Sequence, residues 1–416
     1  CYGGTAINNI LPTQDQFYNK DIEIPDYDFY SPDALGDAKE LADIYVKNGY
    51  EDVEAKAGVH HGTFKVYVNF IPVADITQMD SQLFKYVGRE SIQINGIRYA
   101  PPNFLRMGMY LELSRPDGDV SRWEKVLKRL MLLNKNYPIS DNNCSNIDFQ
   151  RKYENSKEES KKVYFTVRDS AIDQGLIFFG GYASSLYAKY MPAKKRRQVD
   201  KIPDFDLLAE DPKKAAIIIK ERLEEEGVTK ITIIQKPGIG EIIAPHYEVV
   251  VGSETVCFIY EPLACHSYNI ITISGKKVKI ATIDTMLSFY LAFIYADRPY
   301  YDFTRIVCMA QYLFEVQLRN QLKQKGLLKR FSINCYGNQL TLEDIRSEKA
   351  KKYQNLKKKQ SSKEYEEYFL RYVPMEKKNK KAKKTQKNQK AKKQTKKIHY
   401  TPYSSKKTRR VLNIEY

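Results

Sequence analysis

Two aspartates separated by one residue form the pattern in this sequence that is most suggestive of chemistry. Asp26 and Asp28 follow Pro25 in a segment that predicts a strand, so both carboxylates should lie on one face. Two like charges this close disfavour joint ionisation unless a cation or a proton neutralises them. Magnesium is a natural partner, because it takes oxygen ligands from a few carboxylates together with substrate phosphates. The pattern therefore predicts a site for a divalent cation.

A third acid and a glycine pair extend this pattern. Asp75 follows another strand-like segment, and three carboxylates suit a two-metal site that activates a hydroxyl and holds a triphosphate with its leaving pyrophosphate. Upstream of the acids are Gly3, Gly4 and Thr5. Because the glycines have no side chain, backbone amides can approach phosphate oxygens there. A lone Gly-Gly is usually a turn, and a lone Asp-x-Asp is often a solvated loop. The ordered set, rather than any single member, predicts catalysis.

The arrangement occurs a second time, at an offset of about 180 residues. Gly180 and Gly181 are followed by Asp204 and Asp206, and the interval from the second glycine to the first aspartate is 22 residues in one copy and 23 in the other. Further along, residues 70–75 resemble residues 260–265, and residues 105–113 resemble residues 286–293. Four correspondences in the same order indicate a duplicated unit.

The second copy departs from the first at two positions. Tyr182 stands where the first copy has a threonine, and alignment of the two proline-containing segments places Cys265 where the first copy has its third aspartate. A bulky ring would face phosphate, and only two carboxylates would remain. We therefore expect Asp204 and Asp206 not to support catalysis.

Each copy begins with alternating, strand-like sequence and ends in sequence of helical period, as in residues 122–130. This succession predicts an α+β fold in which each small domain carries a helical extension. Arg122, Lys125 and Arg129 on the first extension could face a triphosphate, although a solvated basic face explains them equally well.

Composition divides the chain into three regions. Residues 140–162 are rich in Asn, Ser, Lys and Glu without a sustained apolar period, which indicates a linker. We expect a catalytic domain with its helical extension and linker over 1–150, a degenerate second domain over 151–346, and a Lys-rich, partly mobile segment over 347–416.

The positive charge lies almost entirely at the C-terminus. The chain carries +17, and residues 376–416 alone hold 16 basic and 2 acidic side chains, hence +14. Such a tail could bind RNA phosphates, but it could also be a localisation signal, a docking arm or the result of an AT-biased genome.

Apolar runs and cysteines exclude other classes of protein. The longest apolar run, residues 285–296, is shorter than the ~20 residues that span a bilayer, so it predicts a buried helix and no membrane partner.

Six cysteines at irregular spacing, without a CxxC pair, indicate reduced thiols in an intracellular compartment. Cys257, Cys265 and His266 are the nearest approach to a metal cluster, and we do not expect zinc there. We expect residues to precede Cys1, because the chain does not begin with Met.

The motifs resemble the polymerase-beta nucleotidyltransferase superfamily, and more closely the poly(A) polymerases of large DNA viruses of the mimivirus and megavirus type. The likeness is dense over residues 1–138, continues as a divergent duplicate to about residue 346, and does not include the basic tail. The resemblance implies tandem duplicated nucleotidyltransferase-like mixed-sheet domains. The segments that carry it are Cys1–Asn9, Pro25–Asp28, Gly58–Thr63, Val73–Asp75, Ala100–Met107 and Gly118–Lys125.

The same resemblance implies a template-independent poly(A) polymerase that adds AMP from ATP to the 3′ ends of RNA with two magnesium, or manganese, ions. It also implies a homodimer that works in the cytoplasmic factory of an infected host cell or in the virion. The second copy would be structural or RNA-binding. In this interpretation the metal ligands are Asp26, Asp28 and Asp75, and the residues that contact the nucleotide are Gly3, Gly4 and Thr5.

Two alternatives remain open from the sequence. One is another terminal nucleotidyltransferase, which would add a different base such as UMP or modify a small molecule. The other is a non-catalytic RNA-binding subunit built on the same scaffold. The complete carboxylate set of the first copy favours the enzyme.

Overall fold

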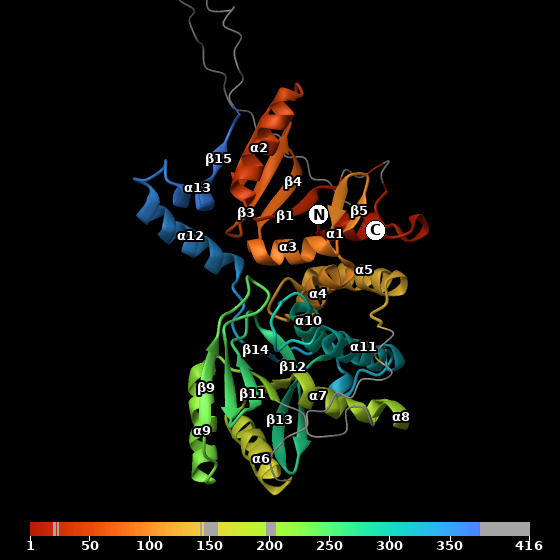
Figure 1. The fold of residues 1–416 in the computed structure, drawn as a ribbon. Coiled ribbons are helices and arrows are strands. Elements are labelled where there is room, and N and C mark those ends of the chain that lie inside the picture. The colour runs from red at the N-terminus through yellow and green to blue at the C-terminus, as the bar shows by residue number, and fades with distance from the viewer. Residues whose placement is uncertain (20–21, 23–24, 142–143, 145–156, 197–204, 375–416) are drawn as a thin grey trace, which may run out of the picture. The chain divides into compact units, whose positions relative to one another are not determined.

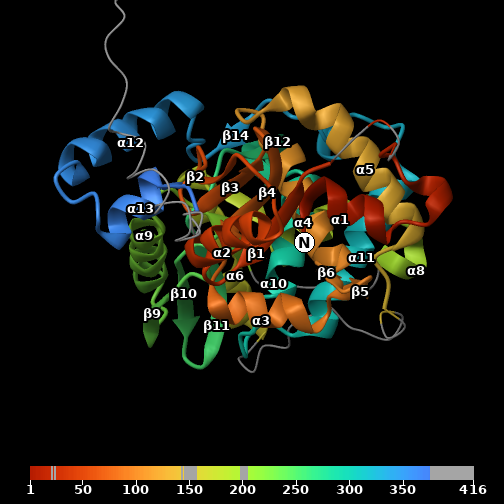
Figure 2. The same cartoon turned by 90° about the horizontal axis from the view of Figure 1, so that it is seen from above.

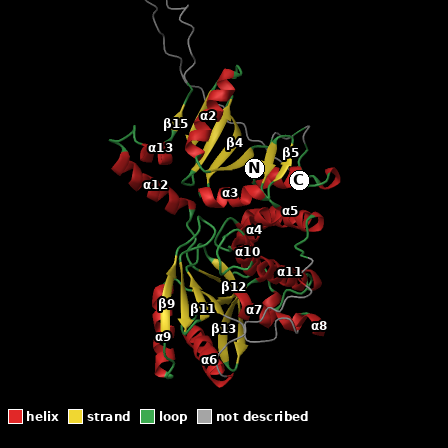
Figure 3. Ribbon diagram, in the orientation of Figure 1, coloured by secondary structure: helices red, strands yellow, loops and turns green. Residues whose placement is uncertain are grey.

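Two mixed sheets with helices between them form the described part of the chain (Figures 1 and 3). The computed structural model describes residues 1–19, 22, 25–141, 144, 157–196 and 205–374. Residues 1–374 belong to one compact unit.

The first sheet has five strands in the order β1-β4-β3-β2-β15, of which four come from the N-terminal half and β15 (Arg371–Tyr372) comes from the end of the described chain. The N-terminal half also contains a two-stranded hairpin, β5-β6. Its elements are α1 (Gly3–Ile10), a 3-10 turn (Thr13–Asp15), β1 (Tyr27–Ser31), α2 (Ala34–Lys47), β2 (Val53–Ala57), β3 (Thr63–Val68), β4 (Ile71–Gln78), α3 (Ser81–Arg89), β5 (Ile92–Ile94), β6 (Ile97–Tyr99), α4 (Pro102–Leu113), a 3-10 turn (Val120–Arg122) and α5 (Trp123–Asn136).

Helix α2 covers one face of this sheet. Alternate residues of the strands point toward it, and they form an apolar core with Ala34, Ala38 and Ala42 of the helix. The helix starts where the side chain of Asp33 accepts a hydrogen bond from the backbone of Gly36. The remaining residues of each strand, which alternate with the core residues, therefore point to the face opposite to α2.

The C-terminal half contains an eight-stranded sheet in the order β14-β12-β13-β7-β8-β11-β10-β9. Its elements are α6 (Lys157–Asp173), β7 (Ile177–Phe179), α7 (Gly180–Tyr187), a 3-10 turn (Ala188–Tyr190), α8 (Ala193–Arg196), β8 (Phe205–Leu208), α9 (Pro212–Glu225), β9 (Ile231–Lys236), β10 (His246–Val251), β11 (Glu254–Tyr260), β12 (His266–Ile273), β13 (Lys276–Ala281), α10 (Ile283–Ile294), α11 (Phe303–Arg319), a 3-10 turn (Gly326–Leu328) and β14 (Cys335–Tyr336).

Strand topology repeats between the halves, as the sequence duplication predicted. In the first sheet β1 runs parallel to β4, which is followed in space by antiparallel β3 and β2. In the second sheet β8 runs parallel to β11, which is followed by antiparallel β10 and β9. A helix that begins at a Gly-Gly pair precedes each parallel pair in the chain, α1 in one copy and α7 in the other.

The two halves share one apolar core through equivalent helices. Helices α4 and α10 are the corresponding apolar stretches of the two copies, and they pack against each other between the sheets (Figure 3). The rings of Phe104 and Tyr295 meet edge to face at 5.1 Å between their centroids. Every residue of α10 is buried, as predicted for this apolar run. Within the described residues, no helix is both long and apolar enough to cross a membrane.

The segment that starts at residue 342 folds back onto the first sheet. It contains α12 (Leu342–Leu356) and α13 (Lys363–Phe369), which are labelled in Figures 1 and 2, and β15 (Arg371–Tyr372). Strand β15 pairs antiparallel with β2. Leu370 is buried in the core beneath α2, and the Tyr368 ring lies 4.2 Å from that of His61. We call residues 342–372 the strap. Lys377–Lys397 lies outside the described residues.

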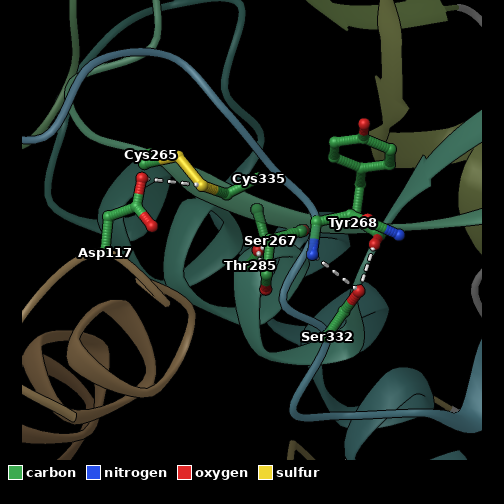
Figure 4. The surroundings of a disulfide bond; sticks show 8 residues. Asp117, Cys265, Ser267, Tyr268, Thr285, Ser332 and Cys335 are labelled. Atoms are coloured by element: carbon green, nitrogen blue, oxygen red, sulfur yellow. Dashed lines mark hydrogen bonds between the residues drawn. A yellow bond between two sulfur atoms is a disulfide. The ribbon is translucent and has the colours of Figure 1, made fainter.

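Four of the six cysteines form disulfides, which corrects the expectation of reduced thiols. Cys144 pairs with Cys308, and Cys265 pairs with Cys335, while Cys1 and Cys257 remain thiols. Separations of 164 and 70 residues explain why the spacing along the sequence does not reveal these pairs. The second disulfide joins the loop before β12 to β14, with the carboxylate of Asp117 beside it (Figure 4). Because Cys265 is oxidised, it is not available as a zinc ligand beside Cys257 and His266.

A buried ion pair anchors the first turn of α10. Asp284 is fully buried and accepts two hydrogen bonds from Arg330, at 2.9 Å from Nε and 2.5 Å from Nη2. We expect Asp284→Ala to lower the free energy of unfolding by about 3–5 kcal/mol, because Arg330 would keep a buried charge without its partner. Chemical denaturation measures the loss.

The exposed pair between Glu124 and Lys128 provides the matched control. Their side chains are 80% and 72% exposed. Glu124→Ala should therefore leave the free energy of unfolding nearly unchanged. Equal losses of unfolding free energy in Asp284→Ala and Glu124→Ala would contradict the larger contribution that we expect from the buried pair.

Candidate functional site

The three predicted acids converge at one end of the first sheet. Asp28 on β1 is the direct neighbour of Asp75 on the parallel strand β4, and Asp26 immediately precedes β1. One carboxylate oxygen of each residue lies within 4.8 Å of the other two. The structure therefore brings together the three acids that the sequence analysis singled out, although Asp28 and Asp75 are 47 positions apart in the chain.

The glycine turn packs directly against this cluster. The backbone N–H of Tyr2 donates a hydrogen bond to the carbonyl of Asp28 at 2.8 Å, and α1 begins at the next residue. Gly3 has a φ of +70°, and a Cβ atom at this position would lie 2.2 Å from Oδ2 of Asp28. Both the backbone conformation and the close approach require glycine here.

Thr5 fixes the backbone of one member of the acid cluster. Its side chain is buried, and Oγ1 donates a 2.6 Å hydrogen bond to the backbone carbonyl of Asp26. This bond fixes the segment that carries the first acid, which is a structural role that the sequence motif did not reveal. Contact of Thr5 with a nucleotide stays a prediction.

Gly4 faces a second group of side chains. A Cβ atom at Gly4 would lie 2.4 Å from the Tyr18 hydroxyl and 2.7 Å from Nη1 of Arg129. Arg129 donates a 2.9 Å hydrogen bond to that hydroxyl, and its guanidinium stacks 4.7 Å from the Phe17 ring centre. The glycine turn thus lies between the acid cluster and a cationic side chain.

Arg129 also lines a shallow surface pocket. Of the three cations that the sequence singled out, Lys125 and Arg129 line this pocket, whereas Arg122 pairs with Glu112 at 3.1 Å and lies near Asp28. Sequence reasoning missed the aromatic residues of the pocket, because no spacing rule connects the loop after α1 with α5. The residues that line the pocket are Phe17, Tyr18, Ser121, Glu124, Lys125, Lys128, Arg129 and Leu132.

The electrostatics of the cluster suit a cation. Burial, together with the charges of Asp26 and Asp75, raises the pKa of Asp28 to about 6. Lys65 neutralises part of this charge through an ion pair with Oδ2 of Asp75. The other oxygen of that carboxylate, Oδ1, is buried and has no hydrogen-bond partner among the described residues. An orphaned carboxylate oxygen beside two further acids is a donor set that fits Mg²⁺ or Mn²⁺.

The second copy keeps the glycine turn but loses the third acid. Gly180 has a φ of +66°, and a Cβ atom there would lie 1.8 Å from Oδ2 of Asp206. The strand neighbour of Asp206 is Phe258, whose ring stacks on that of Tyr300 at 5.7 Å. An aromatic pair therefore occupies the position that corresponds to Asp75. Asp204 lies outside the described residues.

This register corrects the sequence alignment of the third position. Cys265 was matched to Asp75 through the prolines of the two segments, but Pro72 lies within β4 whereas Pro262 follows the end of β11. The prediction that the second copy lacks a third carboxylate holds with Phe258 in that position. Tyr182, which replaces the threonine, is buried with its ring 4.9 Å from that of Phe178.

Comparisons with known proteins identify related sequences for the first half. Residues 1–119 match the sequence model of the family described as "Poly(A) polymerase catalytic subunit". A protein of Acanthamoeba polyphaga mimivirus, named as a candidate poly(A) polymerase catalytic subunit, is 35% identical over 144 residues, which cover 34% of this chain and 24% of that protein. A protein of the same name from African swine fever virus (isolate Pig/Kenya/KEN-50/1950) is 33% identical over 144 residues, 33% of this chain and 30% of that protein.

A solved structure extends the comparison to most of the chain. The crystal structure of the Megavirus polyadenylate synthase matches with a TM-score of 0.72 at 20% identity, over 89% of this chain and 75% of that chain. This match confirms the α+β fold with mixed sheets. The sequence matches confirm the predicted resemblance over residues 1–119, and they span about a quarter to a third of the length of those relatives.

Protonation of Asp28 gives a test of the acid cluster. Its pKa rises from 3.8 to about 6 on folding, so the stability that it contributes below about pH 4 is lost as the pH rises through 6. Without metal, Asp28→Asn should be more stable than the natural protein at pH 7.5, by about 2–3 kcal/mol. The difference should vanish at pH 4.

Thermal unfolding in EDTA at pH 4, 5, 6 and 7.5 measures this difference. Added Mg²⁺ should stabilise the natural protein at pH 7.5 more than it stabilises the Asn variant. A stability difference that stays constant from pH 4 to 7.5 would contradict the shifted pKa of Asp28.

Proposed function

We propose that this protein is a poly(A) polymerase, which adds AMP from ATP to the 3′ end of RNA without a template. The observation that carries the proposal is the convergence of Asp26, Asp28 and Asp75 beside the Gly3-Gly4 turn. The family match covers this same region, and the relatives are named for this activity. Fold alone would not decide the reaction, since one scaffold hosts many functions.

Asp26, Asp28 and Asp75 would hold two divalent ions, Mg²⁺ or Mn²⁺. When bound, such ions supply Lewis-acid activation of the RNA 3′ hydroxyl and charge neutralisation of the triphosphate and leaving pyrophosphate. The orphaned Oδ1 of Asp75 supports this assignment, because a buried carboxylate oxygen without a partner is costly unless a ligand binds it. Lys65 holds the other oxygen of Asp75 and thereby fixes the orientation of the carboxylate.

The glycine turn and the pocket of α5 would bind the nucleotide. Gly3 and Gly4 bring the N-terminus of α1 beside the acids, where the helix dipole favours a phosphate. Arg129, which faces Gly4, and the exposed Lys125 place positive charge on the far side of that turn. We assign them to the triphosphate of ATP.

The second copy acts as a scaffold in this proposal. Phe258 and Tyr300 fill the position of the third acid, and α10 supports α4 through the shared core. The partners that we propose are ATP, the RNA 3′ end and a second copy of the chain in a homodimer. By analogy with the viral relatives, we propose action in the host cytoplasm or in the virion.

Extension of a labelled oligo(A) primer with each of the four NTPs and Mg²⁺ tests the function. We expect long tails from ATP alone, and a loss of at least about 1,000-fold in Asp26→Ala/Asp28→Ala. Asp206→Ala is the matched control, because Asp206 occupies the equivalent strand position of the second copy, and it should retain substantial activity.

Other outcomes of this experiment would each indicate a different function. Extension with UTP instead of ATP would keep the mechanism and replace the substrate. A folded protein that binds RNA but never extends it would be a non-catalytic subunit. Loss of activity in Asp206→Ala would show that the second copy takes part in the reaction.

The triphosphate assignment makes a narrower prediction. Lys125→Gln should raise KM for ATP about tenfold, because one charge-assisted contact to a phosphate would be lost, while the affinity for the primer stays unchanged. Lys47→Gln removes the same charge from an exposed position at the end of α2 and should leave both constants unchanged. Steady-state kinetics at varied ATP and at varied primer separate the two effects.

A further inference from the structure

Five charged residues form a single row across the five strands of the first sheet. Asp28 on β1 is the register neighbour of Asp75 on β4, which is the neighbour of Lys65 on β3. Lys65 is the neighbour of Lys56 on β2, and Lys56 is the neighbour of Arg371 on β15. The row begins with two carboxylates and continues with three cations.

All five side chains belong to the face opposite to α2. Register neighbours in adjacent strands share a face, and the alternating residues Phe64, Val66 and Ala74 are buried against α2. Tyr372, next to Arg371, points to the α2 side, where its hydroxyl donates a 2.9 Å hydrogen bond to Asp43. Arg371 must therefore point to the face that carries the acid cluster.

The cations remain accessible to solvent. Arg371 is exposed, and the side chains of Lys56 and Lys65 are 36% and 34% exposed. Lys65 pairs with Asp75, and Lys56 pairs with Glu54 while its ammonium lies 5.2 Å above the Tyr67 ring. With strands about 4.8 Å apart, the row extends about 14 Å from Asp75 to Arg371.

The three cations of the row and the glycine turn lie on opposite sides of the acids. That turn lies against β1, at one edge of the sheet, whereas β3, β2 and β15 continue toward the other edge (Figures 1 and 3). In an in-line displacement the attacking hydroxyl and the leaving pyrophosphate lie on opposite sides of the phosphorus atom. If the triphosphate binds at the glycine turn, an RNA strand that approaches over β3 and β2 brings its 3′ hydroxyl to the side opposite to the leaving pyrophosphate.

We propose that Lys65, Lys56 and Arg371 bind the backbone phosphates of the RNA strand behind its 3′ end. This inference rests on the proposed function, because it names the path of the polymer that the acid cluster would extend. Cations that follow one another at strand spacing suit a phosphate backbone and read no base, as template-independent extension of a repetitive tail requires.

Through Arg371, the strap contributes a cation to the proposed RNA path. It comes from a strand that is more than 300 residues away in the chain from Lys56, and the region of the family match, residues 1–119, does not include it. Residues 376–416, with their charge of +14, follow this strand in the sequence.

Binding of a fluorescent single-stranded oligo(A) to the full chain, measured by anisotropy at several salt concentrations, tests the proposal. Lys56→Gln/Arg371→Gln should weaken binding about tenfold at 0.1 M salt. It should also reduce the slope of log K against log salt by about 1.4, since each lost phosphate contact removes about 0.7 for a single strand. KM for the primer should rise by a similar factor, and KM for ATP should not change.

Matched variants separate a lost contact from a damaged fold. Lys47→Gln, at the end of α2 and hence on the other side of the sheet, should bind RNA like the natural protein. Lys56→Gln alone leaves the strap intact and should show about half of the change in slope. Equal RNA affinity and slope in the natural protein and the double variant, with both still making tails from ATP, would overturn this path and leave the proposed function standing. A natural protein that binds no RNA would overturn both.

Discussion

Repulsion among three carboxylates is the constraint on which the rest of the first half depends. Asp28 and Asp75 are register neighbours on parallel strands, so the sheet itself forces them together, and the pKa of Asp28 rises accordingly. Such a cluster persists only because its surroundings fix it. Thr5 holds the backbone of Asp26, Lys65 holds one oxygen of Asp75, and the absence of a Cβ atom at Gly3 leaves room for Asp28. Each of these features fixes the position of an acid, and of the three only Lys65 also offsets part of the unfavourable charge.

The second copy shows what the same backbone becomes without this constraint. Its glycine turn still approaches Asp206, and its strands keep the same order and direction. With Phe258 in place of the third acid, however, aromatic rings pack where a charge would need compensation. Burial of apolar surface then stabilises the packing of this region. Helix α10 completes the core around α4, so loss of the second copy would expose the apolar side of the first.

Local patterns predicted the acid cluster, the duplication and the buried helix, because each depends on residues that are close in sequence or repeated in order. Relations between distant segments could not be predicted. Alignment by proline misplaced the residue of the second copy that corresponds to Asp75, because Pro72 lies within a strand and Pro262 lies beyond one. The disulfides join cysteines that only tertiary folding brings together. The strap was not foreseen, because its Lys-rich composition conceals anchors such as Tyr368 and Leu370, which hold it to the first half through packing and not through periodicity.

Pairing of β15 with β2 also changes what counts as the first domain. Residues 27–78 supply four strands, but the fifth comes from residues 371–372, after the chain has completed the entire second half. Without that strand β2 would be an unprotected edge, and Leu370 would leave the core beneath α2. The first half therefore depends on the second for support through α10 and on the strap for closure of its sheet. A segment cut after residue 119 would contain every acid of the cluster and still lack both supports, so the chemistry and the stability of this protein reside in different parts of its sequence.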